Sequence, residues 1–447
     1  MRRSVVVAAS AALAMVAVPL GSGVAAGVPG RATVVASAAL APSPNLVDRA
    51  AAAGISWPST PSWDVTPVDY DGDGDVDFSM SLHMRNAGEL RRNNGDGTFT
   101  RVGVGAVMPR PSPEGGLVDR HSCAWSDVDR NGLPDLYCAA GRYRSNRLKD
   151  ESINNELFLQ TSAGSFRDVA TASGVGEPCT RGRHIAVLDV NGDGWDDLFV
   201  GAQKERNASG DPCNQQSGYP YNEQSKVFVN LGDNAQGEWR GFRAGTEWNV
   251  TQPNTGNRFA ITWDYNHDGR DDLLTGAYAN QRPRLYRNDG GGFTEIGRSG
   301  QVPLPAVNGV ELADLTGDGI LDLVFADDAG FAYRAGTAAG LSGTTVRIGT
   351  PPAGGRGWRV AVGDINGDGR TDVYGLVAST GSGNPADGVF VRTAGGGWQP
   401  HEVPGAGGDS NSVAAVEVGN RAQFVVLNGG NAESENPGPV QLIAWTG

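Results

Sequence analysis

The stretch DYDGDGDVD (residues 69–77) decides the fold of this chain, because five further copies of its pattern follow. They read DVDRNGLPD (127–135), DVNGDGWDD (189–197), DYNHDGRDD (264–272), DLTGDGILD (314–322) and DINGDGRTD (364–372). Each copy has an oxygen-bearing side chain at positions 1, 3 and 5, a glycine at position 6 and an aspartate at position 9. Position 1 is also an aspartate in every copy. Such regularity indicates one built site repeated six times rather than a set of solvated turns.

The spacing of these oxygens is typical of a tight loop that binds Ca²⁺. This ion takes about six to eight oxygen ligands, which a short loop supplies from alternate side chains and one backbone carbonyl. A glycine at position 6 lets the chain turn at positive φ without a Cβ clash. Position 7 has no common side-chain chemistry, so its shared ligand is the backbone carbonyl. The sequence therefore predicts about six structural Ca²⁺ ions.

The predicted side-chain ligands occupy positions 1, 3, 5 and 9 of the six loops. They are Asp69, Asp71, Asp73, Asp77, Asp127, Asp129, Asn131, Asp135, Asp189, Asn191, Asp193, Asp197, Asp264, Asn266, Asp268, Asp272, Asp314, Thr316, Asp318, Asp322, Asp364, Asn366, Asp368 and Asp372. The predicted carbonyl ligands are Asp75, Leu133, Trp195, Arg270, Ile320 and Arg370.

Short apolar runs on both sides of each loop predict two β-strands joined by it. An EF-hand would need flanking helices and a glutamate at position 12, and the copies have neither. The third copy, for example, follows IAVL and precedes LFVGA. After each loop comes a second phrase with a glycine-rich turn, such as RLYRNDGGGFTEI, which reads as a third and a fourth strand. Each repeat is therefore a four-stranded antiparallel unit.

Repeats of this length with four strands each predict a β-propeller, because one such sheet must stack on neighbours to cover its faces. A seventh unit follows as SVAAVEV, QFVVLN and VQLIAWTG, without calcium ligands and with only three strands. Residues 45–56 resemble the segment before the third loop and precede the first blade. We expect them to supply the missing strand, so that the domain 45–447 is an all-β, seven-bladed propeller closed by its N-terminal strand.

With these loops, the NDGGGFTEI phrase and the count of seven units, the chain resembles the FG-GAP/VCBS repeat family and is similar to the N-terminal propeller of integrin α subunits. The resemblance covers essentially the whole chain after its leader. It implies a calcium-binding propeller. Members of the family include integrin ligand-binding heads, propeller lectins and polysaccharide lyases, so the resemblance does not select one function.

The N-terminal residues are typical of an exported protein. Two arginines precede an apolar run and a segment of small residues, which predicts a signal peptide over 1–26, exported by the Sec route because the residues after the arginines match a Tat signal poorly. Residues 27–44 read as a flexible lead-in. We expect a secreted monomer without a membrane span. The net charge of −14 comes largely from the predicted Ca²⁺ ligands, so bound Ca²⁺ would offset most of it. This acidity argues against nucleic-acid binding.

Four cysteines in an exported protein predict two disulfides. Cys123 and Cys138 flank the second loop and lie on the two arms of one hairpin. Cys179 and Cys213 fall in connections that we expect on the same face of the ring, so we predict that they form the second disulfide. The alternative is that these thiols are buried and reduced.

The longest insertions predict where a partner binds. They join strands two and three of the second and third units, and so leave the face opposite the calcium loops. The first contains a basic cluster, and the second mixes tyrosines with amides, which suits a glycan or an acidic protein segment. The candidate ligand-binding residues are Arg142, Tyr143, Arg144, Arg147, Tyr219 and Tyr221. Ordinary solvated loops are the plain alternative.

We expect a binding protein rather than an enzyme. The chain has no G-x-S-x-G, H-E-x-x-H or P-loop motif, and its five histidines are scattered over different units. One alternative is a calcium-dependent polysaccharide lyase in which Lys149 or Arg147 removes the proton next to a uronate carboxylate. Another is a structural protein of the cell surface. The main interpretation is an extracellular module that recognises a glycan or a protein.

Overall fold

A computed structural model describes residues 39–57, 62–82, 88–103, 120–141, 155–176, 182–202, 225–248, 250, 259–276, 282–297, 301–381, 383, 385–405, 410–429 and 438–447. Within them the chain is almost entirely β-strand and turn, with one 3₁₀ turn at Thr246–Trp248. None of its described helices is long and apolar enough to cross a membrane.

Seven four-stranded sheets form the body of the protein. Blade by blade, the strands are β2 (Ser62–Val68), β3 (Asp77–Leu82), β4 (Glu89–Asn93) and β5 (Phe99–Arg101) in blade 1; β6 (Arg120–Ser126), β7 (Asp135–Ala140), β8 (Glu156–Ser162) and β9 (Ser165–Asp168) in blade 2; β10 (Gly182–Leu188), β11 (Asp197–Ala202), β12 (Lys226–Asn230) and β13 (Phe242–Ala244) in blade 3; β14 (Phe259–Trp263), β15 (Asp272–Gly276), β16 (Arg284–Asn288) and β17 (Phe293–Glu295) in blade 4; β18 (Gly309–Ala313), β19 (Asp322–Asp327), β20 (Gly330–Arg334) and β23 (Val346–Gly349) in blade 5; β24 (Gly355–Gly363), β25 (Asp372–Ser379), β26 (Gly388–Arg392) and β27 (Trp398–Glu402) in blade 6; and β28 (Ser412–Val418), β29 (Arg421–Leu427), β30 (Gln441–Trp445) and β1 (Leu46–Asp48) in blade 7. A two-stranded ribbon of β21 (Gly336–Thr337) and β22 (Gly340–Leu341) projects from blade 5.

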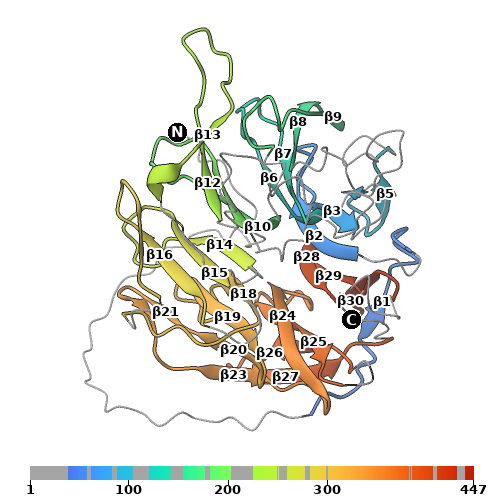
Figure 1. The fold of residues 1–447 in the computed structure, drawn as a ribbon. Coiled ribbons are helices and arrows are strands. Elements are labelled where there is room, and N and C mark those ends of the chain that lie inside the picture. Colours follow the sequence, from blue (N-terminus) through green and yellow to red (C-terminus); the bar gives the residue numbers. More distant parts are fainter. Residues whose placement is uncertain are drawn as a thin grey trace, which may run out of the picture.

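The blades are arranged in a ring around a central axis, with the first strand of each blade innermost (Figure 1). Every pairing within a blade is antiparallel, as a meander of short connections requires. Each acidic loop joins the first and second strands of its blade, so the six loops share one end of the ring. The prediction of an all-β, seven-bladed propeller is therefore confirmed.

The N-terminal strand closes the ring. β1 pairs antiparallel with β30, with Leu46 opposite Trp445 and Asp48 opposite Ile443, so the first and last segments of the chain complete one sheet. This contact covers an edge that would otherwise expose unpaired backbone groups. The strand is shorter than the sequence indicated, because only Leu46–Asp48 of the expected segment 45–56 is extended. The chain then turns, and Ile55 is buried against blade 1.

Part of the expected flexible lead-in also packs on the ring. The backbone N–H of Glu402 donates to the carbonyl of Ala41 over 2.8 Å, and Pro42 forms a parallel bridge with the same residue. Leu40 packs against the core of blade 6. The residues just before β1 therefore lie along the outer strand of blade 6, and the N-terminal segment contacts two successive blades.

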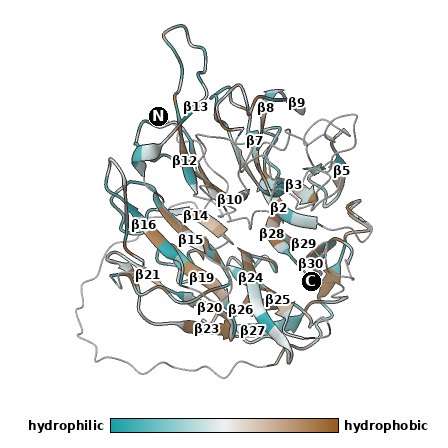
Figure 2. Ribbon diagram, viewed as in Figure 1, coloured by the Kyte–Doolittle hydropathy of each residue, from teal (hydrophilic) through white to brown (hydrophobic). Residues whose placement is uncertain are grey.

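The hydrophobic core consists of seven clusters, as far as the described residues show, and each cluster fills the space between two neighbouring blades. Alternation along the second strands explains this arrangement, since successive side chains of a strand point to opposite faces. In β11, Leu198 and Val200 pack towards blade 2, whereas Phe199 packs towards blade 4. Hydrophobic residues accordingly run through the inner strands, while hydrophilic residues concentrate in the turns (Figure 2). One blade cannot bury both faces alone, so the sheets are stable only as a ring.

A disulfide joins Cys123 of β6 to Cys138 of β7. The two residues lie directly opposite each other in the strand register, on either side of the second acidic loop. The predicted partners Cys179 and Cys213 lie outside the described residues.

Glu311 is a carboxyl group in the interior of the ring without a compensating partner. It lies on the inner strand β18 and is half-buried. Burial raises the pKa of Glu311 to about 7, and no described charge or hydrogen bond opposes this shift. The ionised form is therefore disfavoured in the folded state.

Replacing Glu311 by glutamine should change the pH dependence of stability. Because the folded pKa lies above the unfolded one, the native protein loses stability as pH rises from about 4.5 to about 7. Glu311→Gln removes this loss. The free energy of unfolding of the variant should therefore equal that of the unchanged protein at pH 4.5 and exceed it by about 1–3 kcal/mol above pH 7. Urea unfolding of both proteins across this range measures the difference. A constant difference at all pH values would contradict the assignment.

Candidate metal centre

The first aspartate of each loop holds the loop closed. In all six loops its carboxylate accepts a hydrogen bond from the backbone N–H of the position 6 glycine, over 2.7–3.1 Å. The side-chain oxygen at position 5 likewise accepts the N–H of position 7, over 2.8–3.1 Å. The same residue types that could bind a cation thus fix the backbone turn, which explains why their spacing repeats.

The last aspartate of each loop ties three strands together. Its Oδ2 accepts the N–H of position 2 over 2.8–3.1 Å. Its Oδ1 accepts an N–H within two residues of the end of the third strand over 2.6–2.8 Å. These aspartates are at most 1% exposed. Burial raises the pKa of Asp77, Asp272 and Asp372 to about 7, and that of Asp135 and Asp197 to about 8, so a nearby cation would favour their ionised forms.

Two positions of each loop adopt positive φ. Position 6 is a glycine in every copy, with φ between 81° and 91°. Position 4 is also left-handed, at φ between 56° and 77°, and there Arg130 and His267 are not glycines. They are the only such residues in the described part of the chain. Glycine occupies position 4 in four of the six loops, and this pattern could have predicted the second left-handed residue of each loop, which sequence reasoning missed.

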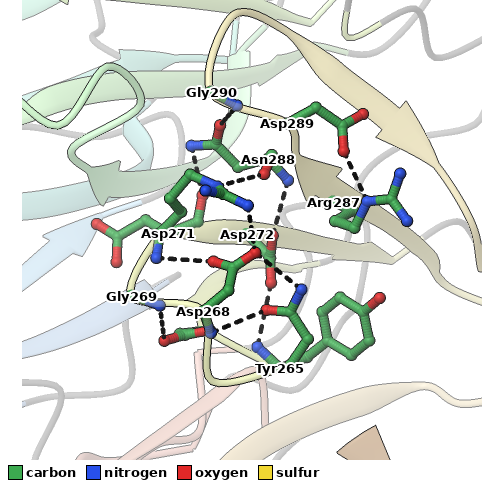
Figure 3. Close-up of polar contacts among 12 residues, drawn as sticks. Tyr265, Asp268, Gly269, Asp271, Asp272, Arg287, Asn288, Asp289 and Gly290 are labelled. Carbon is green, nitrogen blue, oxygen red and sulfur yellow. Dashed lines mark hydrogen bonds and ion pairs between the residues drawn. The ribbon is translucent and has the colours of Figure 1, made fainter.

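An amide side chain links each of the first four blades to the blade before it, at position 2 of that blade's acidic loop for blades 2 to 4 and at strand β28 for blade 1. In blade 4 this residue is Asn288, whose Nδ2 donates to Asp271 O of the same blade over 3.2 Å and to Val190 O of blade 3 over 2.9 Å. Figure 3 shows Asn288 between the loop and the Gly290 turn. Asn93, Gln160 and Asn230 make the same pair of contacts. Sequence reasoning missed this link, although an asparagine or a glutamine occurs at or near the end of the third strand in all four blades.

The loops of blades 1 and 2 fit a hard divalent cation. Oxygens of Asp69, Asp71 and Asp77 lie within 4.8 Å of one another, and so do those of Asp127, Asp129 and Asp135. In each set one buried oxygen, Asp71 Oδ1 or Asp127 Oδ1, has no hydrogen-bond partner. An unpaired carboxylate oxygen among other carboxylates is unfavourable without a cation. The donor set consists only of oxygens, which is the chemistry that Ca²⁺ prefers.

Trp195, at position 7 of the third loop, packs against its surroundings. Arg130 of the second loop lies over its ring, with the guanidinium carbon 3.9 Å from the ring centroid. On another side its indole abuts Gly232, where an added Cβ would lie 2.7 Å from Nε1. Arg130 also donates to Gly194 O of the third loop. Trp195 therefore helps to join blades 2 and 3.

The opposite end of the ring has different chemistry. Arg142, Tyr143, Arg144, Arg147, Tyr219 and Tyr221, proposed from the sequence as ligand-binding residues, lie outside the described residues. The structure instead shows aromatic and basic side chains where the inner strands begin. Trp63 stacks on His121 with ring centroids 4.6 Å apart, and Arg183 Nη1 lies 2.8 Å from His121 Nδ1.

Blade 6 adds to this end of the ring. Arg356 lies over Trp358, with its guanidinium carbon 5.0 Å from the ring centroid. Burial lowers the pKa of Arg359 and raises that of Asp64, and each charge opposes the shift of the other. These residues come from blades 1 and 6 and are far apart in the sequence, so no local motif identifies them.

Replacing His267 by glycine should stabilise the protein. His267 is exposed and left-handed, a conformation that costs a residue with a side chain about 1 kcal/mol relative to glycine. We expect His267→Gly to raise the free energy of unfolding by about that amount in urea. Arg130→Gly is the comparison, because it relieves the same strain and loses the contacts with blade 3. A destabilised His267→Gly would contradict this account.

The amide contacts can be tested with two neighbouring asparagines. Asn93 is fully buried and donates to Val76 O and to Glu417 O of blade 7, whereas Asn94 is exposed and bonds to Thr98. Asn93→Ala leaves two carbonyls unpaired and should cost about 2–3 kcal/mol of unfolding free energy. Asn94→Ala should cost less than about 0.5 kcal/mol. Equal losses in chemical unfolding would show that the buried amide does not link the blades.

Comparison with known proteins places this geometry in context. FG-GAP-like repeats match residues 69–138, 127–200, 264–325 and 314–375. A search of curated proteins finds no match. One similar solved structure is described as the structural basis of specific recognition of non-reducing terminal N-acetylglucosamine by an Agrocybe aegerita lectin. The two sequences are 17% identical, the TM-score is 0.47, and the alignment covers 78% of this chain and 81% of the lectin chain. Another, YCF48 bound to D1 peptide, is 8% identical, with a TM-score of 0.48, and covers 93% and 99%.

The repeat matches account for more than half of the chain and include all six acidic loops. They begin at position 1 of a loop in each case and run through the strands that follow it. This protein therefore belongs to the FG-GAP-like repeat family.

Proposed function

We propose that this protein is an exported, calcium-stabilised β-propeller that binds an extracellular glycan or protein through the face opposite its acidic loops. The observation that carries the proposal is the chemical difference between the two ends of the ring. Carboxylates line one end, where they also fix the loop backbone. Tryptophan and arginine side chains gather at the other end.

Calcium would stabilise the folded state because the loops exist only there. A ligand that binds the native but not the unfolded chain raises the free energy of unfolding with its concentration. The paired carboxylates of blades 1 and 2 and their unpaired oxygens support this role. Export is supported by the disulfide between Cys123 and Cys138, since such bonds persist in oxidising compartments.

The binding face is supported by its exposed chemistry and by the connections that leave it. Trp63 and Trp358 are half-buried, so part of each ring contacts solvent. Flat aromatic rings beside guanidinium groups suit sugar rings and acidic substituents. The connections between β7 and β8 and between β11 and β12, which contain the predicted ligand-binding residues, leave from the same end. The ligand is therefore expected to contact both the inner strands and these connections.

We propose binding without catalysis. The strongly shifted pKa values of the loop carboxyls have structural causes, because these groups are buried and accept backbone hydrogen bonds. Asp387, whose pKa burial raises to about 6, accepts hydrogen bonds from Tyr374 and from the backbone of Val377. Neither set places a base beside an exposed reaction site.

A pair of tryptophans tests the proposed face. Trp358 lies under Arg356 at the proposed face, and Trp398 lies under Arg392, 5.2 Å from its guanidinium carbon, at the loop end of blade 6. The calcium-loaded protein is screened on neutral and uronate-bearing oligosaccharides. Trp358→Ala and Trp63→Ala should weaken the binding of a retained oligosaccharide at least about ten-fold, whereas Trp398→Ala should leave it unchanged.

Two outcomes would contradict the proposal. Equal effects of Trp358→Ala and Trp398→Ala, with melting temperatures unchanged, would exclude this face. Formation of unsaturated sugar ends from the uronates would show a lyase in place of a binding module. Melting curves of all three variants identify any that fail to fold.

A further inference from the structure

The six loops share one backbone geometry but differ in the number or the placement of their carboxylates. Blade 1 has carboxylates at positions 1, 3, 5 and 9. Each other loop has three, at positions 1, 3 and 9 in blade 2 and at positions 1, 5 and 9 in blades 3 to 6. Ligand charge is one of the main determinants of Ca²⁺ affinity in loops of this kind, and it separates blade 1 from the rest. The contacts of the individual carboxylates separate the others.

In blades 1 and 2 three carboxylates converge, and none of the described arginines or lysines forms an ion pair with them. The three oxygens in each set lie within 4.8 Å of one another. Asp71 Oδ1 and Asp127 Oδ1 are buried and have no hydrogen-bond partner. Carboxylate oxygens this close to one another repel when ionised. A divalent cation would remove this repulsion.

In blades 4 and 6 an arginine at position 7 already pairs with one of the three loop carboxylates. Arg270 Nη2 lies 2.5 Å from Asp268 Oδ2, and its Nε donates to the carbonyl of Asn288 over 2.8 Å. Arg370 makes the same ion pair with Asp368 and donates to the carbonyl of Arg392 over 3.0 Å. The arginine side chain therefore spans from the loop to the end of the third strand in both blades.

In these two loops a second donor also bonds to Oδ2 of the position 5 aspartate. The position 3 asparagine donates from Nδ2 to Oδ2 of the position 5 aspartate, over 2.9 Å in blade 4 and 3.0 Å in blade 6. Each Oδ2 thus accepts from an amide and a guanidinium. A cation that uses this oxygen must compete with both, although the ion pairs are partly exposed and individually weak.

We infer that the loops form two classes of cation site, with tight Ca²⁺ binding in blades 1 and 2 and weaker binding in blades 4 and 6, where the arginine at position 7 acts as a built-in counter-ion. This inference rests on the calcium binding proposed above and assigns its strength to particular blades. Blades 3 and 5 have three carboxylates and no arginine at position 7, and lie between the two classes.

The location of the two classes has a consequence for stability. Blade 1 lies next to the closing blade 7, to which Asn93 connects it through Glu417 O. The tight site of blade 1 therefore adjoins one side of blade 7, where the two ends of the chain meet, and blade 6 of the weak class adjoins the other side. Loss of calcium should loosen the contact between blades 1 and 7 first, while blades 4 and 6 keep their arginine contacts.

The experiment is a calorimetric Ca²⁺ titration of the purified full-length protein after chelator treatment. Two variants, Asp71→Asn and Asp127→Asn, each remove a negative charge from a tight site. Two others, Arg270→Gln and Arg370→Gln, each remove the arginine that pairs with an aspartate of a weak site. Arg347→Gln is the matched control, because Arg347 forms an ion pair of 2.6 Å with Asp327, at the end of β19 that is remote from the acidic loop. Each aspartate variant should lose one tight site. Each loop arginine variant should tighten one weak site about five-fold, and the control should change nothing.

Hydrogen exchange gives a second measurement that does not depend on the variants. In excess chelator, deuterium uptake should rise first in residues 69–93 and 127–160, and later in 264–288 and 364–392. The reverse order, six sites of one affinity, or loop arginine variants that bind like the control would overturn the inference and leave the proposed function intact. Absence of calcium binding to the unchanged protein would overturn both.

Discussion

The buried aspartate that ends each acidic loop is the interaction on which every one of the first six blades depends. Its two oxygens accept backbone N–H groups from the loop and from the end of the third strand, so one side chain aligns three strands. Burial disfavours its ionised form, yet the charged form is the better acceptor. A cation in the loop would resolve this conflict by stabilising the charge. Folding and metal binding would then be coupled through a single carboxylate.

The ring extends this coupling from blade to blade. The core lies between the sheets rather than within them, so each blade depends on two neighbours for the burial of its side chains. In the first four blades, amide side chains such as Asn230 and Asn288 add a polar link to the blade before. A change in one loop can therefore reach the next blade through a carbonyl that both share. β1 makes the system closed by joining the last sheet to the start of the chain.

The two ends of the ring differ in chemistry because the topology separates their connections. Loops between first and second strands must all leave at one end, and connections between second and third strands at the other. The acidic end is occupied by hydrogen bonds that maintain the turn geometry, which limits how far its residues can vary. The end with Trp63, Trp358 and Arg359 has no such repeated backbone requirement. Its side chains differ between blades, as expected of a surface that recognises one ligand.

Much of this protein follows from sequence alone, because its determining contacts are local and repeated. The spacing of aspartates and glycines specifies each loop, and alternating apolar residues specify the strands, so the seven blades and the opposed cysteines of β6 and β7 could be predicted. The short extent of β1, the contact of Pro42 with blade 6 and the links made by Asn93 were not predictable. They join segments distant in sequence, and no local pattern encodes their partners. Tertiary structure alone decided that Arg270 and Arg370 turn back onto their own loops, because a side chain's direction depends on what surrounds it in the folded ring.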